Sequence, residues 1–190
     1  RALIASHPKA TADYLEYRRE IEAVAAEMAA RRATDADKAL LADIIQRMEH
    51  AHATANFATE VEIDVEFHHA VGECAHNFVL LHTLRACYRL LADGVFYNRA
   101  RVYDLPGARE ALLAQHSAIF HAIRDGNPAA ARKASVDHIA YVEEASAQAE
   151  RTGERERVAG LRLRQRTENA QSARSRGRPT RTRRPAQASS

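Results

Sequence analysis

The sequence predicts an all-α protein, an antiparallel bundle of about six helices followed by a disordered basic C-terminal tail. Three observations lead to this prediction. Apolar residues recur at helical spacing through the first 150 residues, and no stretch alternates polar and apolar residues as a strand does. Capping residues, glycines and prolines divide that region into helices with short links. Beyond residue 150, arginine, serine, threonine and glutamine replace most large apolar residues.

The first three helices are recognised at their starts. A long apolar stripe predicts a first helix over residues 11–32. Thr34 and Asp37 resemble a capping box, with Asp in place of the usual Glu, and predict a second helix that ends near residue 52. Asn56 can cap the third helix, because its side-chain oxygen accepts a hydrogen bond from a free backbone N–H of the first turn.

The later helices are separated by glycine and proline. Asn77 can cap a fourth helix, and the chain breaks at Gly107 before a fifth. Gly126 suits the left-handed residue that follows a helix, and Pro128 suits the first position of the next one. This sixth helix is expected to end near Gln148. Beyond it, the composition allows a short helix at 158–166, and disorder is expected beyond Ala170.

Composition excludes several classes of protein. No apolar run reaches the ~18–20 residues of a membrane helix. Cys74 and Cys87 are the only cysteines, which favours an intracellular protein with reduced thiols over a disulfide scaffold. The formal net charge of +3 combines −6 in residues 1–150 with +9 in residues 151–190. The high isoelectric point therefore comes from the tail, and the folded part is not itself an obvious nucleic-acid surface.

Three histidines and one aspartate stand on the apolar stripes of predicted helices. Asp64 and His68 are four residues apart, so they share one face of the third helix. His116 stands on the stripe of the fifth helix and His138 on that of the sixth. Burying such groups without partners costs several kcal/mol each, and one divalent cation would satisfy all four. The alternative is a set of core histidines that bond to the backbone or to one another.

The predicted ligand atoms limit the choice of metal but do not identify a single one. Neutral imidazoles and a carboxylate suit zinc, which is the first choice, and also nickel, iron, cobalt or manganese. Three nitrogens and one oxygen from the protein would leave one or two coordination positions for water or a small anion.

These residues lie in segments that resemble the FCD domain, the effector-binding C-terminal half of FadR-subfamily GntR transcription regulators. Residues 64–68 (DVEFH) match its D-x-x-F-H motif, and residues 116–127 (HSAIFHAIRDGN) match its H-x-x-I-x-x-A-I-x-x-G-(D/N) segment. Residues 14–22 (YLEYRREIE) resemble its first-helix signature, and His138 stands where the last family histidine stands. The resemblance covers roughly residues 10–148.

The resemblance implies a ligand set and a function. In that family an Asp and three His bind a metal, so Asp64, His68, His116 and His138 are the implied ligands. These histidines also distinguish the metal-binding branch from the acyl-CoA-binding branch, which lacks them. The implied function is that of a sensor rather than an enzyme. A small carboxylate metabolite bound at or beside the metal would control DNA binding allosterically.

The expected domain organisation follows from the same resemblance. Residues 1–9 are expected to lead in from a winged-helix DNA-binding domain that this chain lacks. Residues 10–150 are expected to form the FCD-like effector-binding domain, and residues 151–190 an Arg-rich, mostly disordered tail outside the family pattern. The full regulator is expected to be a cytoplasmic homodimer that binds operator DNA through the missing domain, because palindromic operators mirror two-fold symmetry. No membrane partner is expected.

Four residues are candidates for contacts with the effector. Arg18 matches the family arginine on the first helix, and its guanidinium could hold a carboxylate through two parallel hydrogen bonds. The alternative is a surface arginine paired with Glu22 one turn later. Arg85, Tyr88 and Asn98 of the fourth helix could also line the cavity, or could form a solvated or dimer-facing surface.

The tail contains a short motif with its own interpretation. Residues 176–179 (RGRP) resemble the core of an AT-hook, which makes Arg176 and Arg178 candidates for contacts in an A·T minor groove. A four-residue match is very short, and the tail is rich in arginine throughout. A disordered basic extension that adds salt-sensitive, nonspecific affinity is therefore the preferred interpretation.

An enzyme on the same bundle is the main functional alternative. An open metal position can activate water, so a mononuclear metal-dependent hydrolase would fit the ligand set. It would need a general base beside the metal, and Glu66 is expected to point to another face. A di-iron oxidase needs the E-x-x-H motif twice, and the sequence has it once, at Glu66 and His69.

Overall fold

The computed structural model describes residues 8–91 and 101–176, and every long element in these two ranges is an α-helix. The all-α prediction is therefore confirmed for this part of the chain. None of these helices is both long and apolar enough to cross a membrane. The helices are α2 (Pro8–Arg32), α3 (Asp35–Ala53), α4 (Phe57–Cys74), α5 (Phe78–Leu91), α7 (Ala108–Arg124) and α8 (Pro128–Arg176).

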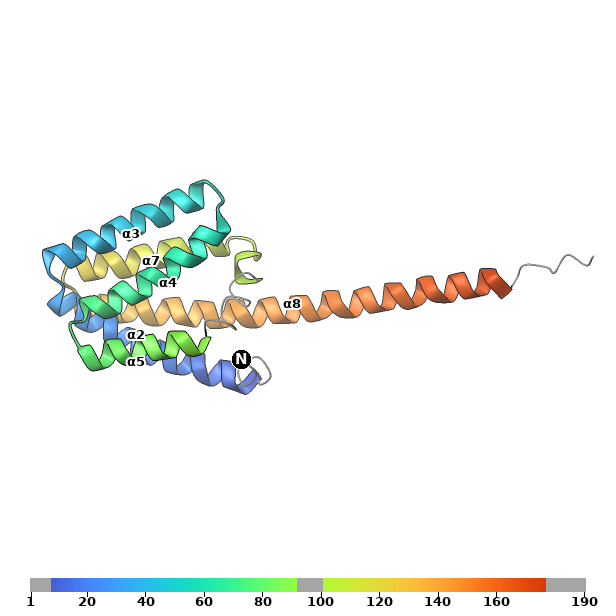
Figure 1. The fold of residues 1–190 in the computed structure, drawn as a ribbon, viewed down its shortest axis with the longest axis horizontal. Coiled ribbons are helices and arrows are strands. Elements are labelled where there is room, and N and C mark those ends of the chain that lie inside the picture. Colours follow the sequence, from blue (N-terminus) through green and yellow to red (C-terminus); the bar gives the residue numbers. More distant parts are fainter. Residues whose placement is uncertain (1–7, 92–100, 177–190) are drawn as a thin grey trace, which may run out of the picture. The chain divides into compact units, whose positions relative to one another are not determined.

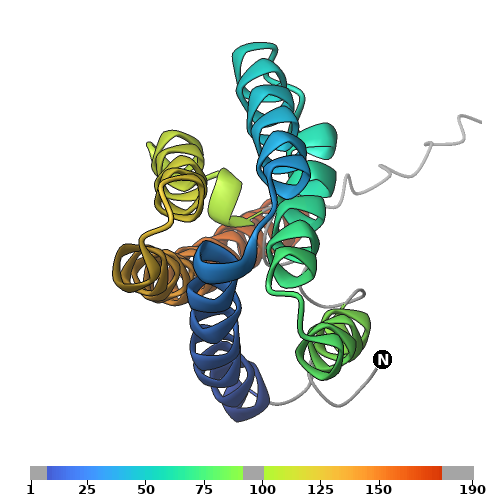
Figure 2. The same cartoon turned by 90° about the vertical axis from the view of Figure 1, so that its left-hand side faces the viewer.

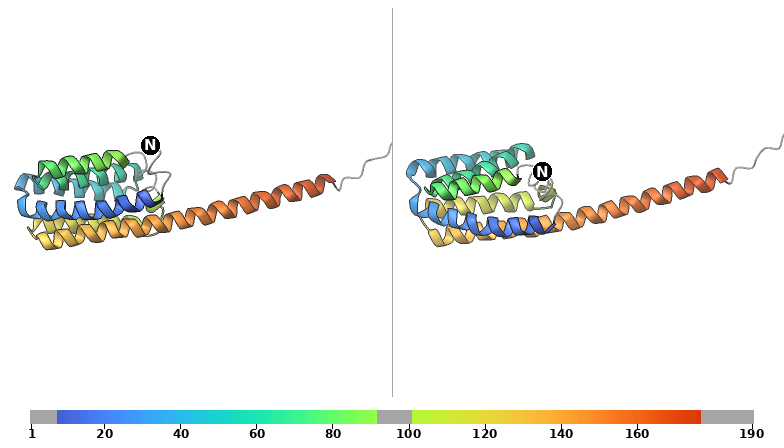
Figure 3. Two further views of the ribbon diagram at one scale, coloured as in Figure 1. Left: turned by 90° about the horizontal axis from the view of Figure 1, so that it is seen from below. Right: turned by 60° about the horizontal axis from the view of Figure 1, so that its bottom comes forward.

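The chain divides into two units, Arg1–Ala149 and Glu150–Ser190. In the first unit the helices lie side by side along a common direction (Figure 1). Figure 2 views them nearly end-on, and Figure 3 shows the same alignment from two further sides. Links of two or three residues join α2 to α3, α3 to α4, α4 to α5 and α7 to α8, so the chain reverses at each one. The first unit is thus an antiparallel bundle.

The helix ends are set by local capping, as the sequence predicts. Thr34 and Asp37 form a full capping box: the Thr34 N–H donates to Asp37 Oδ2 (2.7 Å), and the Asp37 N–H donates to Thr34 Oγ1 (3.2 Å). Asn56 caps α4 by accepting from the backbone of the first turn. Gly107 and Gly126 have φ of 77° and 64°, in the left-handed region that glycine adopts without strain.

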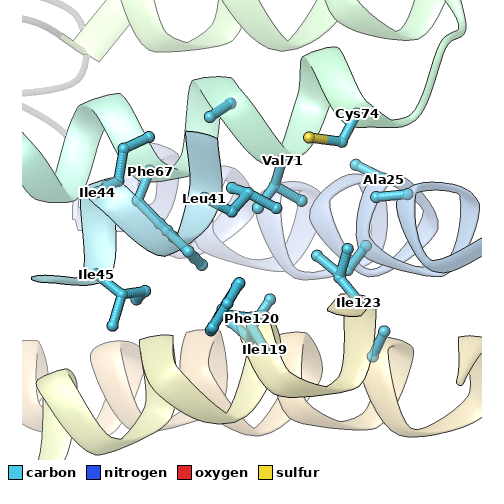
Figure 4. Packing of buried hydrophobic residues seen from close by; sticks show 14 of the residues in the cluster. Ala25, Leu41, Ile44, Ile45, Phe67, Val71, Cys74, Ile119, Phe120 and Ile123 are labelled. Atoms are coloured by element: carbon cyan, nitrogen blue, oxygen red, sulfur yellow. The ribbon is translucent and has the colours of Figure 1, made fainter. Parts of the chain in front are cut away.

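The hydrophobic core lies where α2, α3, α4 and α7 meet (Figure 4). Alanines dominate the buried side of α2, which lets its backbone approach the neighbouring helices closely. Phe67 of α4 is fully buried. Its ring packs edge-on against the rings of His68 and His116, with 5.7 and 5.1 Å between ring centroids. The apolar core therefore forms one wall of the polar site described below.

The predicted end of the last helix near Gln148 is wrong. α8 continues to Arg176 and so includes most of the stretch expected to be a disordered tail. No proline interrupts the chain between Pro128 and Pro179, and Arg, Glu, Ala and Gln all favour helix. Gly153 and Gly160 cost about 1 kcal/mol each, too little to stop the helix. Residues 177–190, where disorder was also expected, lie outside the described residues.

Both thiols are expected to react slowly in the folded chain. Burial raises the pKa of Cys74 to about 12, and burial also raises the pKa of Cys87. Since the thiolate is the reactive form, little of either thiol is available at neutral pH. We predict that a disulfide reagent at pH 8 labels the native chain at least tenfold more slowly than the chain unfolded in urea. Equal rates would contradict the burial of Cys74 and the partial burial of Cys87.

Candidate metal centre

The structure brings together all four residues predicted as metal ligands. Asp64 and His68 lie one turn apart on α4, His116 comes from α7 and His138 from α8. One ligand atom from each residue lies within 4.8 Å of the other three. All four side chains are buried, and the most exposed, His68, has 5% of its surface accessible. Three helices thus converge on one small polar group inside the bundle.

The spacing of the ligand atoms fits a single ion. His116 Nε2 lies 3.1 Å from Asp64 Oδ1 and 3.3 Å from His68 Nε2, and His68 Nε2 lies 3.9 Å from Asp64 Oδ1. Metal bonds of about 2.1 Å at tetrahedral or octahedral angles place neighbouring ligand atoms roughly 3.0–3.4 Å apart. Two of the three separations fall in this range, and the third needs only a small side-chain adjustment.

Two of the histidines are held by acceptors on their far side. His68 Nδ1 lies 2.9 Å from Glu22 Oε2, and His138 Nδ1 lies 3.0 Å from Gln115 Oε1. Because both partner atoms accept hydrogen bonds, the ring proton sits on Nδ1 and the lone pair on Nε2. In His68 that Nε2 faces the other ligand atoms. An acceptor bonded to the second ring nitrogen is the usual arrangement around metal-bound histidines.

Burial favours the neutral form of these rings, which is the form that binds metals. Burial lowers the pKa of His68, against the opposing effect of the Glu22 carboxylate. Burial also lowers the pKa of His138, well below the ordinary value, and the neighbouring rings of His116 and His68 lower it further. The ring centroids of His116 and His138 are 4.5 Å apart, which is close enough for this effect on His138.

Asp64, His68, His116 and His138 are called the histidine group below. A buried ion pair adjoins this group. Arg18 Nε and the Tyr88 hydroxyl both donate to Glu22 Oε1, and the Arg18 guanidinium lies 3.5 Å from the Tyr88 oxygen. Burial alone would raise the pKa of Glu22, but Arg18 and His68 hold it well below the usual range. Glu22 is therefore ionised, and it links the guanidinium on one side to the His68 ring on the other.

The candidate effector residues separate into two groups. Arg18 is 3% exposed and Tyr88 stacks near the His68 ring, with 6.3 Å between ring centroids, so both lie beside the histidine group. Arg18 does pair with Glu22 one turn later, but inside the protein rather than at the surface. Arg85 instead pairs with Glu73, and both of these side chains are about half exposed. Asn98, Arg178 and the side chain of Arg176 lie outside the described residues.

Sequence reasoning missed two residues of the site. Glu22 stands four residues after Arg18, and such pairs are usually exposed and weak. The signal that could have identified it is the alanine-rich stretch of α2 around it, which predicts a buried face. Gln115 directly precedes a ligand in sequence, and nothing in the pattern distinguishes it from a surface glutamine. Only the position of α8 beside α7 places it against His138.

The cavities that border the group among the described residues are small. One of about 20 Å³ touches His116, with Glu60 and Arg109 also in its lining. Another of about 10 Å³ lies between Glu22 and His68. A cavity of this size holds a single water molecule at most. Neither of these two cavities is large enough for a carboxylate metabolite.

Among the residues that the structure describes, no carboxylate beside the group is placed to act as a free general base. Glu66 binds Arg47 on the outside of the bundle through two hydrogen bonds of 2.7 Å. Glu22 is the nearest additional carboxylate that contacts the group, and its oxygens already face Arg18, Tyr88 and His68. The geometry supports ion and ligand binding better than water activation.

Comparison with known proteins adds independent information. A regulatory protein of the L-lactate dehydrogenase operon in Escherichia coli (strain K12) is 37% identical over 142 residues, which are 75% of this chain and 54% of that protein. The Glc operon transcriptional activator of the same strain is 27% identical over 143 residues, 74% of this chain and 56% of that protein. The chain therefore spans about half the length of the curated relatives it matches.

Solved structures and a family model agree with these relatives. The structure of Streptococcus agalactiae GntR is similar with a TM-score of 0.62 and 27% identity, covering 75% of this chain and 62% of the other. Escherichia coli McbR/YncC shares the fold, with a TM-score of 0.65 at 14% identity over 75% of this chain and 66% of the other. The family model named FCD domain matches residues 13–141, which include every residue of the histidine group. This chain therefore belongs to the FCD domain family.

Proposed function

We propose that this chain is the effector-sensing part of a bacterial GntR-type transcription regulator. The observation that supports it best is the buried group of one aspartate and three histidines, with two of its rings oriented by acceptors, in a chain of the FCD family. Asp64, His68, His116 and His138 would hold one divalent ion. Zinc is the first choice, and nickel, iron, cobalt and manganese suit the same donors.

The proposed effector is a small carboxylate. An ion with four protein ligands leaves one or two coordination positions, which a carboxylate oxygen can take. The Arg18 guanidinium and the Tyr88 hydroxyl, which lie near the His68 ring, would supply the positive charge and the donor for that carboxylate. To bind a metabolite, Arg18 must share its donors between Glu22 and the incoming carboxylate, which couples effector binding to the position of α2.

The proposed mechanism is a shift between two arrangements of the bundle. Among the described residues, the two cavities that border the group are water-sized. An arrangement with more space there would bind the effector more tightly, and the effector would increase its population. In a cytoplasmic homodimer this change would alter how DNA-binding domains, supplied by the rest of the regulator, are spaced on operator DNA. No catalytic step is part of the proposal.

L-lactate is the first carboxylate to test, because one relative is named for the L-lactate dehydrogenase operon. We expect L-lactate to raise the melting temperature of the zinc-loaded chain, by an amount equivalent to about 2.7 kcal/mol at 100 times its Kd. The chelated chain should not respond. L-lactamide, which has the same skeleton without the carboxylate, is the matched control and should shift neither form.

The outcomes separate the two parts of the proposal. An equal shift in zinc-loaded and chelated chains would place the carboxylate away from the ion. No shift with L-lactate or a panel of glycolate, pyruvate, succinate and gluconate, in a chain with about one ion bound, would refute the carboxylate effector. Failure to bind any of the five metals would refute the metal centre itself.

A further inference from the structure

The part of α8 within the second unit carries four arginines on one face. Arg151, Arg155, Arg162 and Arg166 are all exposed, and they follow one another at spacings of four, seven and four residues. At 3.6 residues per turn, all four fall within about 60° of the helix circumference. They span 15 residue steps, or about 22 Å along the axis at 1.5 Å per residue. We call these four residues the arginine face.

The acidic residues of the same stretch lie on other sides of the helix. Each of them falls at least about 60° from the nearest residue of the arginine face. Glu154 binds Arg157, which is not part of the face, through two hydrogen bonds of 2.8 and 2.6 Å. Within the part of the chain that the structure describes, no ion pair joins a carboxylate to the arginine face. Its charge is therefore not compensated locally.

The apolar residues of this stretch do not form a competing surface. Leu161 and Leu163 are both exposed, but they point about 160° apart around the helix. A helix that lies on a membrane needs one continuous apolar face, and a coiled coil needs a seam of apolar residues at heptad spacing. This stretch has neither, so a lipid surface and a helical second copy of the chain fit it poorly.

We propose that the arginine face binds the phosphate backbone of duplex DNA. Guanidinium groups pair with phosphate oxygens through two parallel hydrogen bonds, and four of them on one face of a helix match a polyanion with a charge every ~1.7 Å. The contacts would be independent of base sequence and sensitive to salt. The choice of duplex DNA among polyanions rests on the proposed regulatory function. The arginine face itself rests on the helix alone.

The test compares two double variants of the full chain that lose the same charge. Arg155→Gln/Arg162→Gln removes half of the arginine face. Arg157→Gln/Arg164→Gln removes two arginines about 150–170° away from its middle, on the same stretch of helix. Glutamine keeps the helix propensity close to that of arginine, and circular dichroism checks the helix content. Residues 177–190 are the same in both variants, so the difference between them reports on the helix.

Binding is measured by the fluorescence anisotropy of a labelled 20-base-pair duplex between 50 and 200 mM NaCl. For the first variant we expect about tenfold weaker binding at 100 mM NaCl and a slope of log K against log salt that is smaller by about 2. For the second variant we expect the wild-type slope. Equal losses in both variants would show that overall charge, and not the arginine face, determines binding.

Two further outcomes would also overturn the proposal. One is a wild-type chain that does not bind the duplex at 50 mM NaCl. The other is stronger binding to vesicles of anionic phospholipid, or to single-stranded RNA, than to the duplex. The metal content and the lactate response of the same samples are measured in parallel. A failure of the arginine face with an intact metal centre is thereby distinguished from a failure of the proposed function.

Discussion

Replacing His116 by alanine is expected to remove the bound metal. His116 is 2% exposed, and its Nε2 lies within 3.3 Å of ligand atoms from both Asp64 and His68. Losing a residue that only hydrogen-bonds to a metal ligand lowers metal affinity 10- to 100-fold. Losing a direct ligand should lower it more than 100-fold. Elemental analysis should show about one ion per wild-type chain and less than about a tenth of that in His116→Ala.

The melting temperature of the folded chain should depend on whether the metal is bound. An ion that binds only the folded chain at 100 times its Kd adds about 2.7 kcal/mol, roughly 5–10 °C in melting temperature for a domain of this size. A chelator should therefore lower the melting temperature of the wild type by this amount and leave His116→Ala unchanged. The measurement is differential scanning calorimetry with and without the chelator.

Two further variants make the test specific. His121→Ala removes an exposed imidazole five residues after His116 on α7. This variant should keep the wild-type metal content. Asp64→Asn keeps the side-chain volume but loses the charged oxygen, so a loss of metal in this variant is not caused by a cavity. A His116→Ala chain that retains its ion would contradict the proposed ligand set.

Replacing Glu22 by glutamine is expected to destabilise the fold by about 3–5 kcal/mol, the usual cost of removing one partner from a buried pair. Arg18 and Glu22 are 3% and 5% exposed, so the substitution leaves a buried guanidinium without its countercharge. The amide also replaces one acceptor of the Tyr88–His68 network with a donor. Urea denaturation of wild type and variant, both stripped of metal, measures this loss.

The matched control is Glu16→Gln. Glu16 is an exposed glutamate on the same helix, and its substitution should change the free energy of unfolding by no more than about 0.5 kcal/mol. The double variant Arg18→Met/Glu22→Gln removes both charges and should be more stable than Glu22→Gln alone. If the loss in the double variant instead equals the sum of the losses measured in Glu22→Gln and in the single variant Arg18→Met, Arg18 and Glu22 do not act as a pair.

Under the proposed mechanism, Glu22 would couple the site to the helix arrangement. One carboxylate contacts a proposed metal ligand, the arginine nearest the proposed effector position and a tyrosine from a third helix. A change at the histidine group therefore reaches α2 and α5 through direct contacts. Coupling between sites requires such a contiguous path with more than one stable arrangement.

The helix boundaries could be predicted because they depend on local chemistry. Thr34 with Asp37, and Asn56 alone, satisfy free N–H groups of the first turn within three residues of themselves. Such contacts exist in the isolated segment and do not depend on the rest of the fold. The end of α8 was predicted wrongly because composition was taken as evidence of disorder. Helix propensity and the absence of proline before Pro179 allow the helix to continue.

The convergence of Asp64, His68, His116 and His138 was also predictable. Each stands on the apolar stripe of its own helix, and a helix in a bundle must turn that stripe inward. Motif spacing then indicated that the four belong to one site. Their distances were not predictable, because they depend on how far α4, α7 and α8 lie from one another.

The partners of these residues were determined by tertiary packing alone. Glu22 and Arg18 form a pair that is ordinary on an exposed helix, and only the burial of α2 against α4 and α5 makes it costly to break. Arg85 was an equal candidate in sequence, but its helix faces outward there and it pairs with Glu73 instead. The sequence by itself determined which side chains must face inward, because that follows from helical period and hydrophobicity. Only the tertiary structure decided which of them meet, because that depends on the distances and rotations between helices that are far apart in the chain.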